Sequence, residues 1–167
     1  MKEIDVTELT CKPVDLWMNQ WLILTSGTDE DCNMMTVAWG SIGCMWSKPF
    51  VQIVVRPQRH TFQYLEKSDS FTLCAFPGKY RRALQTLGSI SGRDGDKLSK
   101  TNLTLRKSTK VSAPCYNEAS LILECRIMYT QDINPAGFKD PVIEGNYPNK
   151  DYHRAYFGEI VAAFIEE

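Results

Sequence analysis

The sequence predicts a mainly β protein, an antiparallel barrel with a few helices at its periphery. Two observations lead to this fold class. About six runs are rich in Val, Ile, Leu, Thr, Phe and Tyr and are bounded by turn residues, as strands are. Few segments have helical spacing, too few to alternate with strands in a doubly wound sheet. At roughly 100–200 residues per domain, residues 1–167 are expected to form a single domain.

The expected strands follow one another along most of the chain. They are residues 21–27, 34–41, 49–55, 70–76, 120–133 and 156–167. Between the first two, the sequence GTDEDCN carries the Gly, Asp and Asn of a hairpin turn.

Two segments have apolar residues three or four positions apart, the spacing of one helix face. They are residues 60–68 and 79–91, whereas residues 97–100 form a turn at most. Residues 134–155 are rich in Pro, Gly and Asn and are long for a simple connection. Because long ordered loops often carry function, we expect this one to cover a site or a partner.

Composition and charge exclude several classes of protein. The formal net charge is -1, which argues against a protein that grips a nucleic-acid backbone. The first residues lack the apolar core of a signal peptide, and no run reaches the roughly 18 apolar residues of a membrane span. We therefore expect a cytoplasmic protein with no nucleic-acid or membrane partner.

Cysteine and histidine usage gives little sign of a metal or redox centre. The 6 cysteines include no C-x-x-C pair, and most lie inside apolar runs, where cysteines are usually small core residues. A redox role for one of them stays open. With 2 histidines and no clustered ligands, we expect no structural zinc site.

The stretch RPQRHT follows an expected buried strand and opens an expected helix. If the helix begins at Thr61, its hydroxyl can cap a free backbone N–H group, and the helix end favours an anion. Arg56 and Arg59 flank that end and can bind a phosphate bidentately. The alternative is that both arginines are solvated or pair with Glu66 and Asp69.

The sequence SGRDGDK is a second candidate for anion binding. It begins at Ser91 and ends at Lys97, whose charge could reach the same anion. An ordinary polar loop is an equally good interpretation, and an EF-hand is excluded because its spaced oxygen ligands are absent.

A third candidate lies in the expected strand 34–41 and the residue before it. Asn33 and Thr36 are polar residues in an apolar run, and Trp39 is followed by Gly40, where the backbone can approach a flat group. This combination suits a planar heteroaromatic ligand with polar edges. The alternative is a core tryptophan beside a glycine bulge.

Taken together, six motifs occur in one order along nearly the whole chain: N-x-M-T-x-x-W-G, W-x-K-P, V-R-P-x-R-x-T, F-T-L-x-x-F, S-G-R-D-x-D-K and H-R-x-Y-x-G-E-I. This series resembles the flavoredoxin-type branch of the flavin reductase-like, FMN-binding split-barrel proteins. The resemblance implies a six-stranded antiparallel split barrel that forms a homodimer, with FMN near the subunit interface.

The resemblance also implies the residues that bind the cofactor. Asn33, Thr36 and Trp39 would meet the isoalloxazine ring, Arg56, Arg59, Thr61 and Lys97 would hold the phosphate, and Met35, Gly40 and Ser91 complete the set.

One feature departs from the family pattern. Some relatives place a histidine on the long strand after the lysine loop, where this chain has Tyr129 or Gln131 instead. His153 and Trp46 are therefore further candidates for the substrate side, with dimer docking as the alternative role of His153.

In such a protein the flavin carries the chemistry, so we expect no catalytic protein nucleophile. The expected function is electron transfer from NAD(P)H through FMN to a flavin or another acceptor. The alternative is a flavoredoxin-like FMN-binding electron-transfer protein without its own NAD(P)H oxidation, for which the partner would be a protein electron donor. A barrel that binds single-stranded nucleic acid through its arginines is a third hypothesis, which the net charge disfavours.

Overall fold

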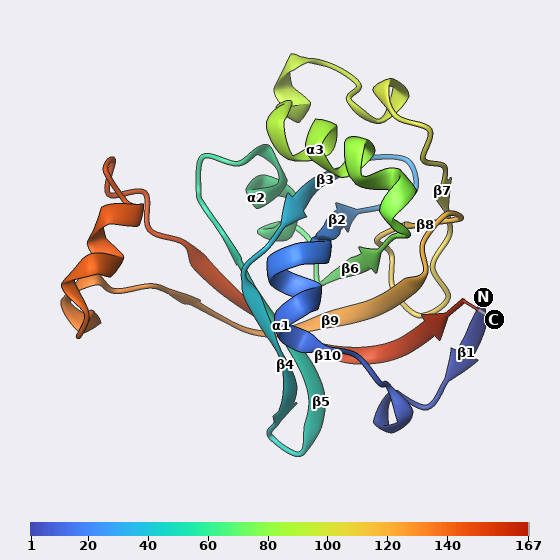
Figure 1. Ribbon diagram of the computed structural model, residues 1–167, viewed down its shortest axis with the longest axis horizontal. Helices are drawn as coiled ribbons and strands as arrows, with labels where there is room; N and C mark the ends of the chain where they lie inside the picture. The colour runs from blue at the N-terminus through green and yellow to red at the C-terminus, as the bar shows by residue number, and fades with distance from the viewer. Residues whose placement is uncertain (167) are drawn as a thin grey trace.

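The computed structural model describes residues 1–166, and its centre is one antiparallel sheet of 8 strands curved into a barrel (Figure 1). The strand order along the sheet is β3 (Cys32–Val37), β2 (Leu22–Gly27), β6 (Ser70–Ala75), β9 (Leu121–Asp132), β10 (Arg154–Ile165), β5 (Lys48–Val55) and β4 (Gly40–Met45). A short strand, β1 (Lys2–Ile4), pairs with the far end of β10. The mainly β class and all six expected strand regions are confirmed.

The number of strands differs from the expected six. Strand β1 was not anticipated, and the strand expected over residues 34–41 is two strands. β3 ends at Val37 and pairs with β2, whereas β4 begins at Gly40 and pairs with β5. The two edges of the sheet are therefore joined only through Ala38 and Trp39, and this junction is where the barrel is split.

Gly40 is what allows the chain to cross between the edges. A Cβ atom there would lie 2.4 Å from the carbonyl oxygen of Gln52 and 2.5 Å from the indole of Trp17. No other residue fits without moving the backbone of β5. The flat group that approaches Gly40 is thus the buried Trp17, which corrects the expectation that this glycine makes room for a ligand.

The core lies on both faces of β2. Leu22 and Leu24 point into the barrel, where they join Val51, Ile53 and other buried residues. Ile23 points the other way and packs beneath a helix with residues such as Leu84. A strand buried on both faces reads as a continuous apolar run, which explains why WLIL shows no alternation.

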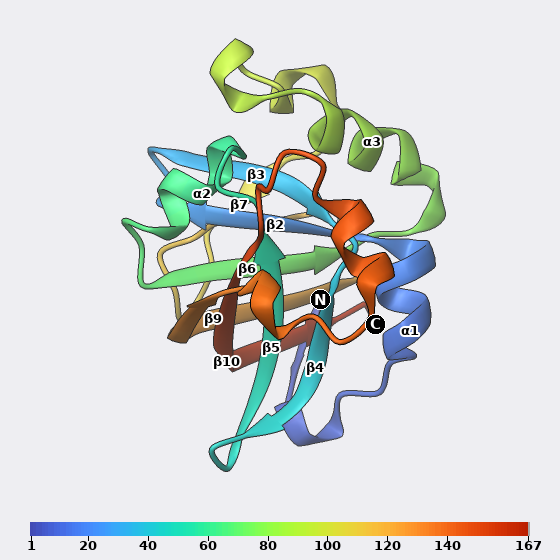
Figure 2. The same cartoon turned by 90° about the vertical axis from the view of Figure 1, so that its left-hand side faces the viewer.

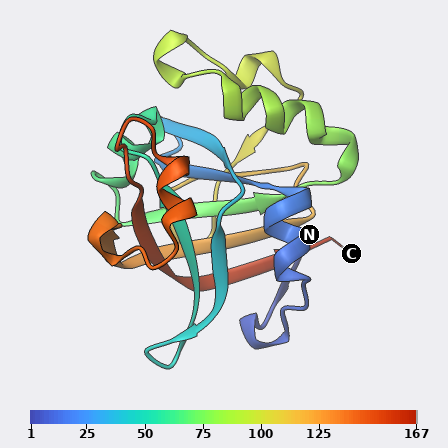
Figure 3. The same cartoon turned by 60° about the vertical axis from the view of Figure 1, so that its left-hand side comes forward.

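Short helices surround the barrel. They are η1 (Val6–Glu8), α1 (Pro13–Asp15), the π-helical η2 (Leu16–Gln20), α2 (His60–Leu65), η3 (Gly78–Tyr80), α3 (Arg81–Ser89), η4 (Gly92–Asp94) and η5 (Leu98–Lys100). α3 lies over β2 and β3 on one side of the barrel (Figure 3), and a ribbon of β7 (Leu105–Arg106) with β8 (Cys115–Tyr116) lies nearby. The two expected helices are confirmed with shorter bounds; α1 and η2 were not anticipated.

Residues 133–153, here called the excursion, leave the sheet between β9 and β10 and project from the barrel (Figures 1 and 2). The excursion contains η6 (Pro135–Gly137) and η7 (Pro141–Asn146). It holds its own small aromatic cluster, in which the ring of Tyr147 lies 5.0 Å from Tyr152 and 6.0 Å from Phe138. The excursion is therefore an ordered element and not a loose connection.

The cysteines are all free, and Cys74, Cys115 and Cys125 are fully buried. Burial raises the pKa of the Cys74 and Cys125 thiols well above the ordinary value, which disfavours the reactive thiolate. Of the helices in residues 1–166, none has both the length and the apolar character of a membrane span.

Candidate functional site

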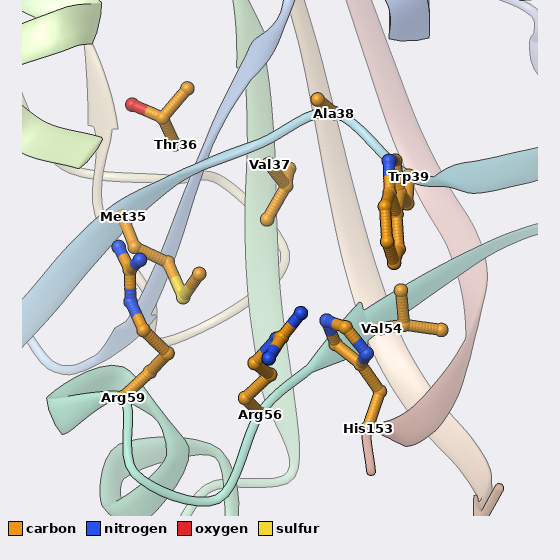
Figure 4. Close-up of a pocket in the computed structure, with 9 residues that line it drawn as sticks. All are labelled: Met35, Thr36, Val37, Ala38, Trp39, Val54, Arg56, Arg59 and His153. Carbon is orange, nitrogen blue, oxygen red and sulfur yellow. The ribbon is translucent and has the colours of Figure 1, made fainter. Parts of the chain in front are cut away.

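Two cavities meet at Arg59, one at the split of the barrel and one beside α2. The first cavity has a volume of about 220 Å³ and is lined by Met35, Thr36, Val37, Ala38, Trp39, Val54, Arg56, Arg59 and His153 (Figure 4). The second cavity has a volume of about 240 Å³ and is lined by Gln58, Arg59, His60, Thr61, Gly88, Ser89, Ile90, Ser91, Gly92, Arg93 and Lys97. Segments expected to bind one ligand thus come together, although they lie far apart in sequence.

The first cavity exists because β3 and β4 separate. The end of β3 forms one wall, and the end of β5 with the last residue of the excursion forms the other. The Thr36 hydroxyl donates a hydrogen bond to the Leu84 carbonyl, which ties this wall to α3. Trp39 stands at the mouth with 48% of its surface exposed, and its ring lies 5.2 Å from that of His153 (Figure 4).

His153 enters the first cavity as a buried neutral imidazole. Its Nδ1 atom lies 2.9 Å from the Tyr147 hydroxyl, and both side chains are buried. Burial lowers the pKa of His153 to about 4, with a further contribution from the Arg56 charge, while Asp151 opposes the shift. At neutral pH the ring therefore carries one N–H group and can donate or accept a hydrogen bond.

Arg56 also lies in the first cavity, where its charge is already balanced. Its Nη1 donates to Asp151 Oδ2 at 2.6 Å, its Nη2 donates to the Asn146 carbonyl, and its guanidinium lies 5.2 Å from the Tyr147 ring centre. Arg56 therefore fastens the excursion to the barrel. This location differs from the expected phosphate contact, and the alternative pairing with Glu66 is wrong because Glu66 binds Arg154.

The second cavity contains cations without carboxylate partners. Arg59 donates to the Gly88 carbonyl at 2.9 Å, and Lys97, only 3% exposed, donates to the carbonyls of Leu87 and Ile90 at 3.1 Å each. Within residues 1–166, neither cation forms an ion pair. Burial, with the nearby Arg59 charge, lowers the pKa of Lys97 to about 8. Buried charge without a counterion is costly, so this cavity is suited to an anion.

Helix α2 begins differently from the expectation. It starts at His60 with Arg59 as the preceding cap residue, and the side chain of Arg59 forms no capping hydrogen bond with the described backbone. Thr61 is buried and its Oγ1 accepts a hydrogen bond from Asn33 Nδ2 at 2.7 Å, which corrects its predicted role as a cap. Asn33 thus packs behind Thr61 at the second cavity, and it does not line the first cavity.

The loop after α3 closes the second cavity through Gly92. A Cβ atom on Gly92 would lie 2.2 Å from Asn33 Oδ1 and 2.8 Å from the ring of His60. A glycine is therefore needed for the loop to approach the bond between Asn33 and Thr61. Ser91 lines this cavity as expected, and its hydroxyl oxygen accepts a hydrogen bond from the Arg93 backbone.

Two expected substrate-side residues lie elsewhere. Trp46 sits in the turn between β4 and β5, and its ring packs 6.0 Å from Tyr129 and 6.4 Å from Phe157 on the outside of the sheet. Neither Trp46 nor Tyr129 lines the first or second cavity. Both are exposed and belong to a separate aromatic surface.

Sequence reasoning missed His60, Arg93 and Tyr147. His60 lines the second cavity, and its Nδ1 is buried without a hydrogen-bond partner in the described chain. Its position inside RPQRHT was a signal that could have been used. Arg93 lies inside the predicted SGRDGDK loop, whereas nothing local in the sequence connects Tyr147 with His153.

Comparison with known proteins gives four informative matches, one to a family model, one to a curated protein and two to solved structures. A family model described as "Flavin reductase like domain" matches residues 18–167. An uncharacterized protein of Archaeoglobus fulgidus is 26% identical over 106 residues, which are 64% of this chain and 59% of that protein. The match therefore spans less than two thirds of that relative.

Among solved structures, flavoredoxin from Methanosarcina acetivorans has a TM-score of 0.69 at 22% identity, covering 89% of this chain and 69% of that one. An FMN-binding domain of a flavin reductase-like enzyme from Shewanella baltica has a TM-score of 0.71 at 16% identity, covering 98% of this chain and 76% of that one. These likenesses confirm the split-barrel fold.

Proposed function

Because the chain belongs to the flavin reductase-like domain family, we propose that it binds FMN across the two cavities and transfers electrons from NAD(P)H to a flavin or another acceptor. The observation that carries this proposal is the junction of the cavities at Arg59. Neither cavity alone reaches the roughly 300 Å³ of a typical small-molecule site. One elongated ligand with a flat end and an anionic end would use both.

The residues present fit FMN at both ends. Arg59 and Lys97 have N–H groups beyond those given to backbone carbonyls, so they can hold a phosphate. The first cavity offers Met35, Val37 and Val54 to an aromatic ring. Met35, Thr36 and Trp39 are the ring-side residues of the proposal, while Arg59, Thr61, Ser91 and Lys97 are those of the phosphate side.

When bound, the flavin would supply the hydride and single-electron chemistry. The protein's own residues position it and control access. Arg56 adds a positive charge beside the ring end that Asp151 partly balances. His153 presents a neutral imidazole oriented by Tyr147, and Trp39 at the mouth offers an indole face on which a nicotinamide can stack.

The test uses purified protein and added FMN. We expect a yellow protein, or quenching of FMN fluorescence on addition, followed by bleaching when NADH or NADPH is added anaerobically. A protein that neither carries flavin nor quenches added FMN would overturn the proposal. Riboflavin, which lacks the phosphate, serves as the control for the contribution of the second cavity.

A second candidate is an FMN-binding electron carrier without NAD(P)H oxidation. The likeness to flavoredoxin favours it. Steady-state oxidation of NADH and NADPH with free flavin as the acceptor separates the two. Turnover indicates a reductase, whereas flavin that binds but is not reduced by either nicotinamide indicates a carrier.

We also propose that the functional unit is a homodimer formed by this single domain. The aromatic surface supports this proposal, because Trp46 is 58% exposed and Tyr129 is 44% exposed. Large exposed aromatic side chains gathered in one place are typical of protein interfaces. Analytical ultracentrifugation of the protein and of Trp46→Ser checks it, with a monomer at micromolar concentration counting against the dimer.

A further inference from the structure

The last residue of the excursion, His153, has its ring between two aromatic side chains. The ring centre of Tyr147, from the excursion, lies 5.5 Å away at an interplanar angle of 78°. The ring centre of Trp39, from the junction of β3 and β4, lies 5.2 Å away at 47°. The backbone amide of Ile133 donates to the His153 carbonyl at 2.9 Å and so joins the two ends of the excursion. His153 is therefore held by its backbone and by two neighbouring rings.

The hydrogen bond between Tyr147 and His153 satisfies both groups in one direction only. Tyr147 is 4% exposed, and within residues 1–166 its hydroxyl has one partner, the Nδ1 atom of His153. A buried hydroxyl that does not donate its proton is costly. The hydroxyl therefore donates, Nδ1 accepts, and the neutral ring of His153 must carry its hydrogen on Nε2.

The Nε2 atom of His153 is the free end of this arrangement. It has no hydrogen-bond partner within residues 1–166, and it is not sealed from its surroundings as Nδ1 of His60 is. His153 lines the first cavity beside Arg56 (Figure 4). An N–H donor is therefore available to this cavity, and a ligand that meets it needs an unprotonated oxygen or nitrogen atom.

The same arrangement opposes protonation of His153. A charged imidazolium carries hydrogen on both nitrogens, so Nδ1 could no longer accept from Tyr147, whose hydroxyl would lose its partner. Two charged groups act on the ring: Arg56, in the turn after β5, opposes a second positive charge, and Asp151, in the excursion, favours it. Burial and the Arg56 charge prevail, because they lower the pKa of His153 to about 4.

We propose that Tyr147 is a positioning residue that fixes His153 as an Nε2–H donor, so that the first cavity selects a ligand edge with a hydrogen-bond acceptor. His153 then acts at neutral pH as a hydrogen-bond donor and not as an acid or a base. The part of this inference that concerns the ligand rests on the proposed flavin site. The position of the proton on His153 follows from the protein alone.

Nitrogen-15 NMR of the ligand-free protein with labelled histidine measures this position directly. The chain has 2 histidines, so the signals lost in His60→Gln identify those of His60. Tyr147→Phe removes the hydroxyl that donates to His153. Tyr152→Phe is the matched control, because it removes a hydroxyl from the same aromatic cluster that donates instead to Glu144 Oε1 at 2.6 Å. Circular dichroism checks that the variants fold.

In the unaltered protein and in Tyr152→Phe, we expect one neutral form of His153, protonated at Nε2, throughout pH 6 to 8, because its pKa is about 4. Tyr147→Phe should give a mixture of the Nε2–H and Nδ1–H forms, because the Tyr147 hydroxyl no longer reserves Nδ1 as an acceptor. Three results would overturn the proposal: a proton on Nδ1 in the unaltered protein, titration of His153 between pH 6 and 8, or an unchanged spectrum in Tyr147→Phe.

Fluorescence titration with FMN tests the ligand part. Tyr147→Phe should bind FMN about threefold more weakly than the unaltered protein, because only a fraction of its molecules presents the Nε2–H group, whereas Tyr152→Phe should show no change. Equal affinities in all three proteins would show that His153 does not select the ligand. If FMN does not bind the unaltered protein, the proposed function fails and the ligand part fails with it, while NMR still decides the role of Tyr147.

Discussion

Arg56 and Arg59 are three positions apart in one turn, yet Arg56 lines only the first of the two cavities of the proposed site, whereas Arg59 lines both. Arg56 faces the first cavity and is ion-paired with Asp151, whereas the side chain of Arg59 donates, within the described part of the chain, only to the Gly88 carbonyl. The charge of Arg56 in the first cavity is thus balanced, and this cavity suits an uncharged ring. The second cavity keeps an excess of positive charge and suits a phosphate. In this turn, the arginine that already has a carboxylate partner is the less suited to an anionic ligand, and the one without such a partner is the better suited.

The largest expected effect separates the two arginines directly. Arg59→Met should weaken FMN binding by about 100-fold, because a hydrogen bond to a charged group contributes roughly 1.5–3 kcal/mol. Arg56→Met should weaken it by only about threefold, because that guanidinium is engaged with Asp151. Fluorescence titration measures both. Equal losses in the two variants would contradict the proposal that only Arg59 holds the phosphate.

The next effect is the pH dependence of the phosphate end. The pKa of Lys97 is about 8 without ligand, and a phosphate favours the charged amine and so raises this pKa. FMN affinity should be constant from pH 7 to 8 and then fall by up to about tenfold per pH unit. Titrations of FMN and riboflavin from pH 7 to 10 check this. Parallel curves for both flavins would remove Lys97 from the site.

A smaller effect concerns Gly92, where the backbone packs closely against the second cavity. In Gly92→Ala the new methyl group would press on Asn33 and His60, so FMN affinity should fall by several-fold and the free energy of unfolding by about 1–3 kcal/mol. In Gly145→Ala, a variant in the excursion, the new methyl group meets no described atom within 4 Å, so this variant is the matched control. Chemical denaturation and FMN titration measure both. A stable Gly92→Ala variant with unchanged affinity would contradict the close packing at the second cavity.

The smallest effect on binding concerns the excursion. Asp151→Asn removes the ion pair with Arg56, so the amides of residues 146–153 should exchange hydrogen faster while FMN affinity changes by less than about threefold. Hydrogen-exchange mass spectrometry measures the first, with Asp69→Asn, an exposed carboxylate outside the ion pairs of the described chain, as the control. An excursion that exchanges as slowly as before would show that its aromatic cluster alone holds it.

Several parts of the site could be predicted because their signals are local. The strand before RPQRHT, the helix after it and the basic residues between them are all contained in one short stretch, and Lys97 follows from a polar loop of typical composition. Gly40 shows where local signals in the sequence fail. Its neighbours in sequence suggested a ligand, but the group that requires a glycine is Trp17, which arrives from a helix that sequence reasoning missed.

Sequence patterns predicted six strand regions, the helices α2 and α3, the family and the basic turn, because periodicity, turn residues and motif order are properties of neighbouring residues. The partner of Arg56 required the three-dimensional structure, since Asp151 lies 95 residues from Arg56 and comes to it through the pairing of β10 with β5. The three-dimensional structure also decided where the barrel opens, because Gly40 and Val37 belong to strands that pair with different partners. The partner of a charged side chain and the edges of a sheet depend on contacts between segments far apart in sequence, which local sequence patterns do not reveal.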